Sequence, residues 1–248
     1  MPDHAIERVV PTGHLFIIFA LDGMTRKTFD NDTLRPNDTF SKAWVSGVHK
    51  NYISISAHQN SEMLVIQFKP YGAFPFLKSS VDSFNDTVVP AENIFGDDIL
   101  NLHEKIVTQE TTQTKLKVAA KWIENKFDNS KTPPADIINI VHQLQNEPTE
   151  NHKTIIDDYA KTQKHLINQF KKYVGVTPKY YHRIVRFNKI LQLIQKREMI
   201  PWGQIAYECN YTDQSHFIKD FKYFSGFNPT EFINNNFDKG ETNFFPLD

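Results

Sequence analysis

A stripe of polar side chains near the carboxyl end of the chain has the donors needed to read a hydrogen-bonding surface. Ser215, Lys219 and Lys222 are spaced at i, i+4 and i+7, which places them on one face of a helix, and Gln214 lies beside them near its start. A glutamine can form two hydrogen bonds with adenine, and a lysine can donate to guanine. These residues have the types and spacing expected of a helix that contacts the base edges of duplex DNA.

The helix that would carry this stripe belongs to a repeat with an offset of 51 residues. The pattern of residues 166–181 returns at 217–232, with large apolar residues at i and i+4, then a glycine and a proline. The glycine can end a helix with positive φ, and the proline three residues later prevents its continuation. A shorter amphipathic stretch precedes each copy, at residues 155–159 and 205–209. The sequence therefore predicts two helix-turn-helix units.

Polar positions of both units are candidates for DNA contact. Asp213 is the expected N-cap of the second reading helix, because its carboxylate can accept a free backbone N–H. His216 returns at the repeat position of His165, where capping and a phosphate contact both stay open, and Arg183 and Arg186 could reach phosphates or pair with an acidic side chain. The candidate DNA-binding residues are Lys164, Asn168, Lys171, Lys172, Arg186, Gln214, Ser215, His216, Lys219 and Lys222.

The connection between the units and the distribution of charge favour the same interpretation. Residues 180–196 form one amphipathic helical pattern, which could hold two reading helices in successive major grooves about 34 Å apart. The net charge of the 248 residues is only −1, but residues 151–236 carry 13 Lys and Arg against 7 Asp and Glu, a local charge of +6. Residues 1–150 carry −5 and residues 237–248 carry −2. A phosphate-binding surface needs such a concentration, although a solvated helical face could also carry it.

The first half of the chain predicts a β-rich region followed by helices. The apolar period becomes helical from about residue 97, and residues 128–134 are the expected linker because their two prolines cannot lie inside a helix. We predict an α+β chain, with a sensing or dimerisation domain at 1–130, an all-α DNA-binding domain at 131–248 and a frayed tail after residue 236. Short β-branched and aromatic segments bounded by turn residues predict strands at 14–19, 42–48, 52–56 and 63–68.

The second unit resembles the DNA-binding domain of the AraC/XylS-type transcription regulators, and the likeness covers about residues 134–236. It implies a sequence-specific DNA-binding transcription regulator that is not an enzyme, with double-stranded DNA and RNA polymerase as partners. Asn168 stands where the family often has arginine, and Ile167 brings no hydrogen bond, so the first unit is expected to bind weakly or only to position the protein. The residues that carry the likeness are Ile205, Ala206, Asn210, Tyr211, Asp213, Ser215, Phe217, Lys219, Phe221, Lys222, Gly226, Asn228, Pro229 and Phe232.

Residues 11–73 look like the amino-terminal domain of one branch of these regulators, through Pro11-x-Gly13, Trp44-x-x-Gly47 and the run from Phe68 to Ala73. This resemblance implies a cupin-like β structure whose ligand is unassigned, so a small-molecule effector and a second copy of the chain are further candidate partners. Trp44, Tyr52, Phe68 and Phe74 could line an effector pocket or form core. A stripe at 116–127 could pack on the β region or contact another subunit; its members are Leu116, Ala119, Ala120, Ile123 and Phe127.

Several other classes of protein are disfavoured. His14, His49 and His58 are scattered and Glu62 alone does not complete a cupin metal site, so we expect no metal and no cofactor. The single cysteine, Cys209, excludes an internal disulfide and suits a small buried residue. We expect no membrane span and a cytoplasmic location. The alternative from another class is a small-molecule-binding or catalytic cupin-like protein whose helical segment serves assembly.

Overall fold

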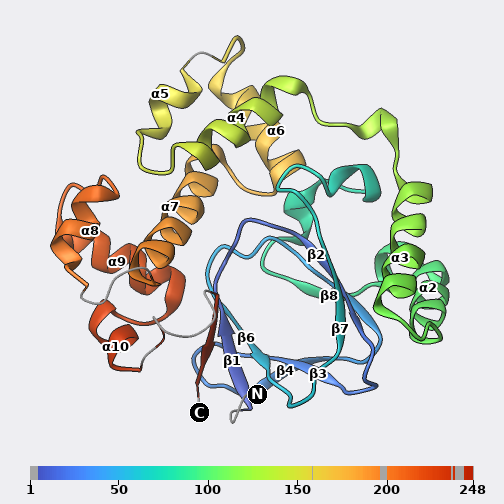
Figure 1. Ribbon diagram of the computed structural model, residues 1–248. Coiled ribbons are helices and arrows are strands. Elements are labelled where there is room, and N and C mark those ends of the chain that lie inside the picture. Colours follow the sequence, from blue (N-terminus) through green and yellow to red (C-terminus); the bar gives the residue numbers. More distant parts are fainter. Residues whose placement is uncertain (1–4, 158, 196–199, 236, 238–242, 248) are drawn as a thin grey trace.

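Two antiparallel β-sheets form the centre of the protein, and helices cover opposite sides of them (Figure 1). The computed structural model describes residues 5–157, 159–195, 200–235, 237 and 243–247. The sheets have the strand orders β4-β3-β6-β1-β9 and β7-β2-β5-β8. The strands are β1 (Ile6–Val9), β2 (Phe16–Ala20), β3 (Arg26–Phe29), β4 (Pro36–Phe40), β5 (Ala43–Ser46), β6 (Ile53–Ser56), β7 (Met63–Gln67), β8 (Val88–Pro90) and β9 (Phe244–Pro246).

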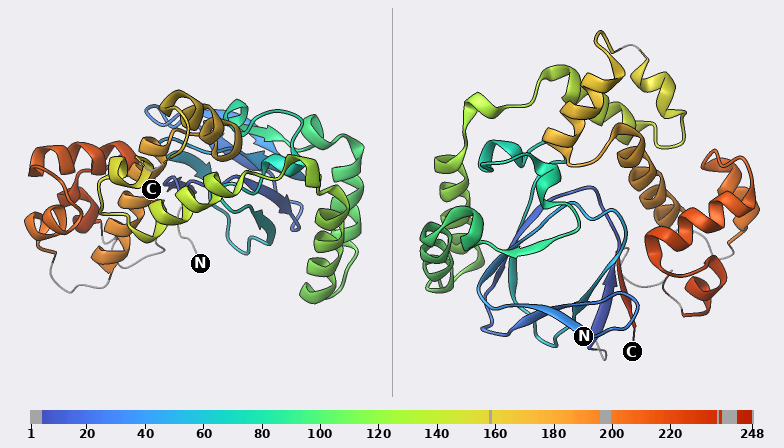
Figure 2. Two further views of the ribbon diagram at one scale, coloured as in Figure 1. Left: turned by 90° about the horizontal axis from the view of Figure 1, so that it is seen from above. Right: turned by 180° about the vertical axis from the view of Figure 1, so that it is seen from behind.

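The helices lie in two groups, and Figure 2 shows α2 and α3 on the side of the sheets opposite to the arc formed by α4 to α10. The expected α+β class is confirmed. Short 3-10 turns η1 (Phe74–Phe76), η2 (Val81–Phe84) and η3 (Asn129–Lys131) connect the elements. The helices are α1 (Glu92–Phe95), α2 (Asp97–Val107), α3 (Thr112–Lys126), α4 (Ala135–Asn146), α5 (His152–Ile156), α6 (Gln163–Val174), α7 (Pro178–Gln195), α8 (Trp202–Glu208), α9 (Gln214–Ser225) and α10 (Pro229–Asn234).

Alternation of apolar side chains builds the sheets. In β7, Leu64 and Ile66 point into the core while Met63 and Val65 are exposed, as the period of two in a strand requires. The four strands that the sequence predicts are all present, at β2, β5, β6 and β7. Residues of β2, β5 and β7 share one apolar core with residues of α2 and α3, so these flanking helices pack on the β-rich region.

The end of the chain returns to this region. Strand β9 pairs antiparallel with β1, with Phe245 opposite Arg8, and Phe245 is buried. The expectation of a frayed tail is therefore wrong for residues 244–246, because β1 has an open edge on that side and Phe245 fills an apolar site beside it. Residues 236, 238–242 and 248 of the expected tail lie outside the described residues, as does Asp158 of the first short amphipathic stretch.

The predicted linker at residues 128–134 contacts the β-rich region, and the predicted apolar stripe on α3 is only partly buried. The backbone N–H of Asp128 donates to the carbonyl of Pro75 at 3.2 Å and Nζ of Lys131 donates to that of Leu77 at 2.9 Å, so the linker lies against the β-rich region. On α3 the buried residues are Ala119 and Trp122, whereas Leu116 is 55% exposed. The predicted stripe therefore packs on its own region only in part. The helix predicted for 180–196 is α7, and Lys196 lies outside the described residues.

Two apolar clusters extend across the predicted domain boundary. One continues from the sheets into α4 and α6, where the ring of Phe74 meets that of Tyr173 edge-on at 5.0 Å. The other joins Val10 and Phe245 to the apolar faces of α7, α9 and α10. Each helix-turn-helix unit thus shares a core with the β-rich region, and the boundary near residue 130 stays a prediction.

Candidate nucleic-acid interface

Helices α6 and α9 are the two reading helices that the repeat predicts, and they are equivalent in their ends. Each has 12 residues, and the second begins 51 residues after the first. The side chain of Thr162 accepts from the backbone N–H of His165 at 3.2 Å, and that of Asp213 accepts from His216 at 2.8 Å. The two histidines therefore recur because each is the third residue of a capped helix. The expected N-cap at Asp213 is confirmed.

The carboxyl ends of the two helices also match. Gly175 has φ of 92° and Gly226 has φ of 77°, and the backbone N–H of each donates to a carbonyl of the last turn. These are the left-handed C-caps that the repeated glycines predict. Asn210, in the turn before α9, has φ of 55°, which asparagine tolerates better than most residues. The local sequence thus fixes where both helices start and stop.

The polar stripe of the second unit faces away from the protein. Phe217, Phe221 and Phe224 are fully buried, and this orients the opposite side of α9 outward. Ile218 is also exposed among the polar residues, at 37%. The exposed candidates on this helix are Gln214, Ser215, His216, Lys219 and Lys222, and those on α6 are Lys164, Asn168 and Lys171.

Lys172 lies apart from these exposed residues. Its Nζ lies 4.8 Å from the centre of the Phe74 ring and 5.0 Å from that of Tyr173. It is half-buried where α6 meets η1. A lysine over an aromatic ring is held by a cation–π interaction. The side chain therefore contacts the β-rich region in this structure.

Arg183 and Arg186 pair with a buried carboxylate that the sequence reasoning did not single out. Nη2 of Arg183 lies 2.8 Å from Oδ1 of Asp220, and Nη2 of Arg186 lies 3.3 Å from Oδ2. The hydroxyl of Tyr211 donates to the same Oδ2 at 3.2 Å, and the guanidinium of Arg186 stacks 4.0 Å from the Tyr211 ring. Of the two roles left open by the sequence, both arginines form the ion pair with an acidic side chain in this structure. An acidic residue on the apolar face of α9, three residues after Phe217, was the available signal.

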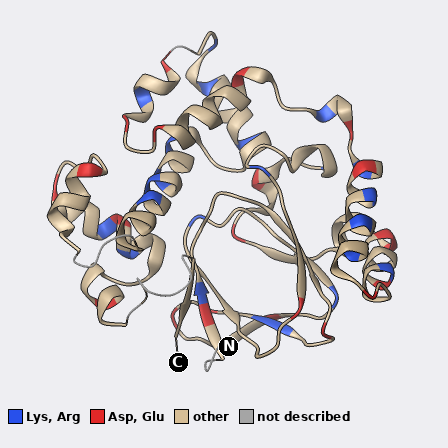
Figure 3. Ribbon diagram, viewed as in Figure 1, with Lys and Arg blue, Asp and Glu red and all other residues tan. Residues whose placement is uncertain are grey.

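Basic side chains gather on the carboxy-terminal helices. Figure 3 shows Lys and Arg along α6 and α7 and beside α9, whereas α2 and α3 carry both signs of charge. On α7 the basic residues are Lys179, Arg183, Arg186 and Lys189. This distribution agrees with the local charge of the sequence and places the positive potential near the reading helices.

The β-rich region holds the carboxyl ends of both reading helices. Nδ2 of Asn85 donates to the carbonyl of Gly175 at 2.6 Å. The guanidinium of Arg8, in β1, lies between the rings of Tyr52 and Phe227, with its carbon 4.1 Å and 4.4 Å from their centres. Its Nη1 is 3.5 Å from the carbonyl oxygen of Ser225, a long hydrogen bond, so the two rings contribute most of the contact. Nothing in the local sequence indicated these roles of Arg8 and Asn85.

The connecting helix α7 is docked in the same way. Nδ2 of Asn188 donates to the carbonyl of Pro11 at 2.9 Å, and the ring of Tyr181 lies so close to Gly13 that a Cβ there would be 2.8 Å from it. The motif Pro11-x-Gly13 therefore forms part of the surface on which α7 packs. The hydroxyl of Tyr180 donates to the carbonyl of Lys50 at 2.9 Å. The two units and their connector thus all contact the β-rich region.

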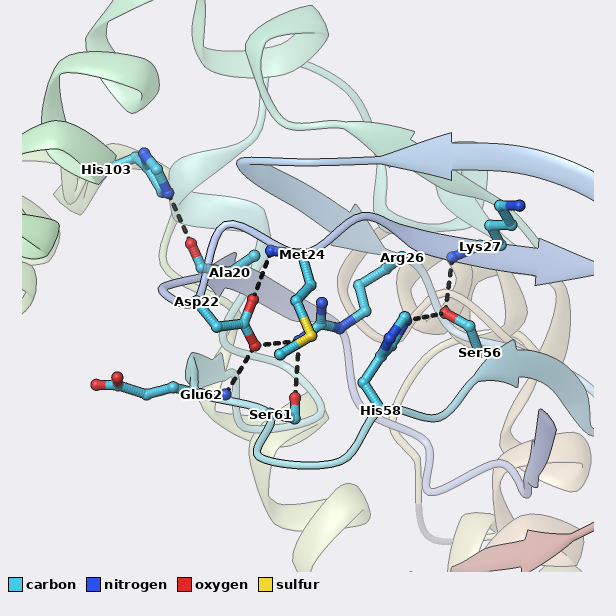
Figure 4. Close-up of polar contacts among 10 residues, drawn as sticks. All are labelled: Ala20, Asp22, Met24, Arg26, Lys27, Ser56, His58, Ser61, Glu62 and His103. Carbon is cyan, nitrogen blue, oxygen red and sulfur yellow. Dashed lines mark hydrogen bonds and ion pairs between the residues drawn. The ribbon is translucent and has the colours of Figure 1, made fainter. Parts of the chain in front are cut away.

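The histidines of the β-rich region are each engaged separately. His14 Nδ1 lies 2.7 Å from the carbonyl oxygen of Phe68, and His49 Nε2 lies 3.0 Å from the hydroxyl of Ser46. His58 Nε2 lies 3.1 Å from the hydroxyl of Ser56 (Figure 4). Within the part of the chain that the structure describes, no three His, Cys, Asp or Glu side chains gather as metal ligands would.

A buried ion pair organises the same end of the β-rich region (Figure 4). Oδ2 of Asp22 lies 2.5 Å from Nη2 of Arg26, and both side chains are less than 10% exposed. Burial alone would raise the pKa of Asp22, but hydrogen bonds from Arg26 and from the backbone of Glu62 and Met24 lower it to about 2. Figure 4 shows Ser61 on the same guanidinium. The candidate pocket aromatics Trp44, Phe68 and Phe74 are buried core residues, and Cys209 is buried as expected.

Known protein families match both regions. Residues 157–235 match a family described as a helix-turn-helix domain, of the AraC type, and residues 2–90 match a domain of unknown function (DUF6597). The uncharacterized HTH-type transcriptional regulator YidL of Escherichia coli (strain K12) is 26% identical over 161 residues, 60% of this chain and 53% of that protein. The probable transcriptional regulator LumQ of Photobacterium leiognathi is 24% identical over 187 residues, 72% of this chain and 74% of that protein. The chain thus spans about half the length of the first of these relatives, at 53%.

A solved structure shares the fold. ToxT from Vibrio cholerae O395, bound to (E)-4-(8-methylnaphthalen-1-yl)but-3-enoic acid, covers 97% of both chains with a TM-score of 0.51 and 14% identity. This neighbour shows a similar fold, and the family match at residues 157–235 confirms the predicted resemblance of the carboxy-terminal region to AraC-type helix-turn-helix domains. The chain carries an AraC-type helix-turn-helix domain at residues 157–235. In the described residues, no helix has the length and apolar character needed to cross a bilayer.

Proposed function

We propose that this chain regulates transcription by binding a specific DNA sequence with α6 and α9 in two successive major grooves. The observation that supports this most is the equivalence of the two helices, which have the same length, the same type of N-cap and the same left-handed glycine at the end. Two such helices joined by the single helix α7 have a fixed separation. No catalytic step is part of this proposal.

On the two reading helices, different residues are proposed to contact base edges and phosphates. Gln214, Ser215 and Lys219 contact base edges, because they are exposed near the start of α9. On the same helix, His216 and Lys222 contact phosphates of the DNA backbone. On α6, Lys164 and Asn168 contact bases less extensively and Lys171 contacts a phosphate, since the half-buried Ile167 adds no hydrogen bond.

Lys172 and Arg186 are proposed to support DNA binding indirectly. Arg186 orders α9 against α7 through Asp220, and Lys172 orders α6 against Phe74. A residue of this kind changes affinity by positioning a helix and not by touching the nucleic acid. The sequence predicts both residues as DNA contacts, and the proposed role differs from that prediction because each of them positions a helix.

The amino-terminal part, which we place at residues 1–130, is proposed to control the DNA-binding part at 131–248. Its contacts to Gly175 and Ser225 fix both reading helices at once. A small-molecule effector, as the acid-bound neighbour of similar fold carries, would regulate only if it bound the docked and released states with different affinity. RNA polymerase and a second copy of the chain are the remaining proposed partners, the copy through the exposed Leu116 face of α3.

Selection of bound sequences from a random pool of duplexes tests the function, with the full chain as the protein. Enrichment of one motif with two conserved segments supports the proposal. A Gln214→Ala, Lys219→Ala double variant serves as the matched comparison, since both residues are exposed and neither contributes to the core. Failure of the full chain to enrich any sequence, or equal enrichment by the double variant, would show that these helices do not read bases.

A further inference from the structure

A polar cleft of about 530 Å³ lies between the two helix-turn-helix units. Its walls come from the start of α5 and the two residues before it, the first three turns of α7, the turn before α9 and the first two turns of α9. Both units therefore contribute to it, together with their connector. Its volume is within the range of small-molecule sites. Its basic and imidazole side chains are those of Lys179, Arg183, Arg186, His152, His182 and His216.

The cleft has more positive charge than its carboxylates neutralise. Asp220 already accepts from Arg183, Arg186 and Tyr211, so its two oxygens are engaged. Lys179 is exposed at the rim and has no ion-pair partner among the described residues. Glu150 is the second carboxylate of the wall and is exposed. Two arginines and a lysine thus face two carboxylates, and amide and hydroxyl donors of Asn151, Asn210 and Thr212 add to them.

Two histidines of the wall have lowered pKa values, to which neighbouring positive charges contribute after burial. Burial lowers the pKa of His152, and the charges of Lys179, Lys153 and Arg186 lower it further. Burial also lowers the pKa of His182 to about 4, with Arg186 and His152 adding to the effect. The His152 and His182 rings lie 6.0 Å apart. The contribution of these neighbouring cations, which is smaller than that of burial, disfavours a further cation at this place and favours an anion.

We propose that this cleft binds a phosphate group held by Lys179, Arg183, His152 and His216, at the junction of the two units. Arginine and lysine are the side chains that bind phosphate most strongly, and a ring N–H of an imidazole can donate to its remaining oxygens. The phosphate comes either from the DNA backbone between the two major grooves or from a small phosphorylated effector. This inference deepens the proposed function, because an anion at this junction would fix the angle between the units.

Binding of inorganic pyrophosphate to the full chain without DNA tests the site itself. The imidazole resonances of His152 and His216 should shift on titration, and Lys179→Gln should weaken binding by about tenfold, as expected for one hydrogen bond to a charged group. The matched control is Lys117→Gln, an exposed lysine of α3 that is not part of the cleft wall. Unshifted histidine resonances, or equal weakening by the two variants, would overturn the proposal.

A second arm identifies the source of the phosphate. With a selected duplex, competition by pyrophosphate and a salt dependence reduced by about one unit in Lys179→Gln indicate a backbone phosphate. Simultaneous binding of pyrophosphate and duplex, with DNA affinity of Lys179→Gln unchanged, indicates a small phosphorylated ligand. Both results support the site. Because the first arm contains no DNA, loss of the phosphate site and loss of sequence-specific DNA binding are separate outcomes.

Discussion

Nδ2 of Asn85, in the β-rich region, donates to the carbonyl oxygen of Gly175 at 2.6 Å, directly at the end of the first reading helix. The second reading helix is held at the equivalent place, where Arg8 reaches Ser225 beside Gly226. The equivalence of the two units therefore includes the ends of their second helices, which both contact the β-rich region.

The close packing around Gly226 predicts that a single added methyl group lowers the stability of the protein more than it would at an open glycine. A Cβ at Gly226 would lie 2.3 Å from Nη1 of Arg8, whereas Gly23 has a similar φ, 71°, and open space around it. Gly226→Ala should therefore destabilise the protein by about 1–3 kcal/mol more than Gly23→Ala, which adds only backbone strain. Urea denaturation measures both free energies of unfolding. Removing the guanidinium with Arg8→Ala in a double-mutant cycle should relieve part of the difference. Equal losses at the two glycines would contradict close docking.

The exposed lysines should separate into base readers and phosphate contacts. Lys219→Ala should weaken binding to the selected site by about 1–3 kcal/mol and relax preference at one base position. Lys171→Ala and Lys222→Ala should weaken all sequences alike and reduce the salt slope by about one unit each. Titrations of a cognate and a scrambled duplex at several salt concentrations distinguish these patterns. If Lys219→Ala lowers affinity equally for both duplexes, Lys219 contacts a phosphate.

Lys172 is expected to act on protein stability, whereas its exposed neighbour Lys171 is expected to act on DNA affinity. Because its ammonium lies over the Phe74 ring, Lys172→Ala should lower the stability of the docked α6, by about 0.5–1 kcal/mol, and leave the salt slope unchanged. Thermal unfolding and the salt dependence of DNA affinity provide the two readouts. A reduced salt slope with unchanged stability would place this lysine on DNA instead.

The pKa values of two buried histidines predict how stability depends on pH. Burial lowers the pKa of His49 and of His182 to about 4, while each returns to about 6.5 on unfolding. The unfolded chain therefore binds more protons between pH 6.5 and 4, and stability falls as the pH is lowered through this window, by up to about 1 kcal/mol per pH unit for each histidine. Urea denaturation at pH 7.5, 6 and 5 measures this slope. His49→Asn should make it shallower, and a slope unchanged by this substitution would contradict the lowered pKa of His49.

The sequence predicted the local structure of the reading helices because their ends depend on neighbouring residues. Asp213, Gly175 and Gly226 act through backbone groups within a few positions, so their local spacing reveals them, whereas the equivalent cap of α6, Thr162, was not predicted. Four strands were evident from their apolar alternation. In contrast, β4 has four exposed residues among five and contains a proline, so its sequence does not look like a strand.

The residues that sequence reasoning missed depend on partners far away in the chain. Arg8 contacts Ser225, 217 positions later, and Asn85 contacts Gly175, 90 positions later. Asp220 indicates its role only through its place on an apolar helix face, and its arginine partners come from another helix. A polar residue at a buried position requires a partner, but the sequence does not say which one.

The central claim is that one chain places two reading helices in successive major grooves of the same duplex. The most direct measurement is the affinity of the full chain for its selected site before and after insertion of about 5 bp between the two conserved segments, which rotates one segment to the far side of the duplex. An insertion of about 10 bp, which restores the face but lengthens the spacing beyond the reach of α7, serves as a control. The two-reader account predicts loss of high-affinity binding with either insertion. Unchanged affinity after the shorter insertion would contradict it and leave α9 as the helix that reads DNA.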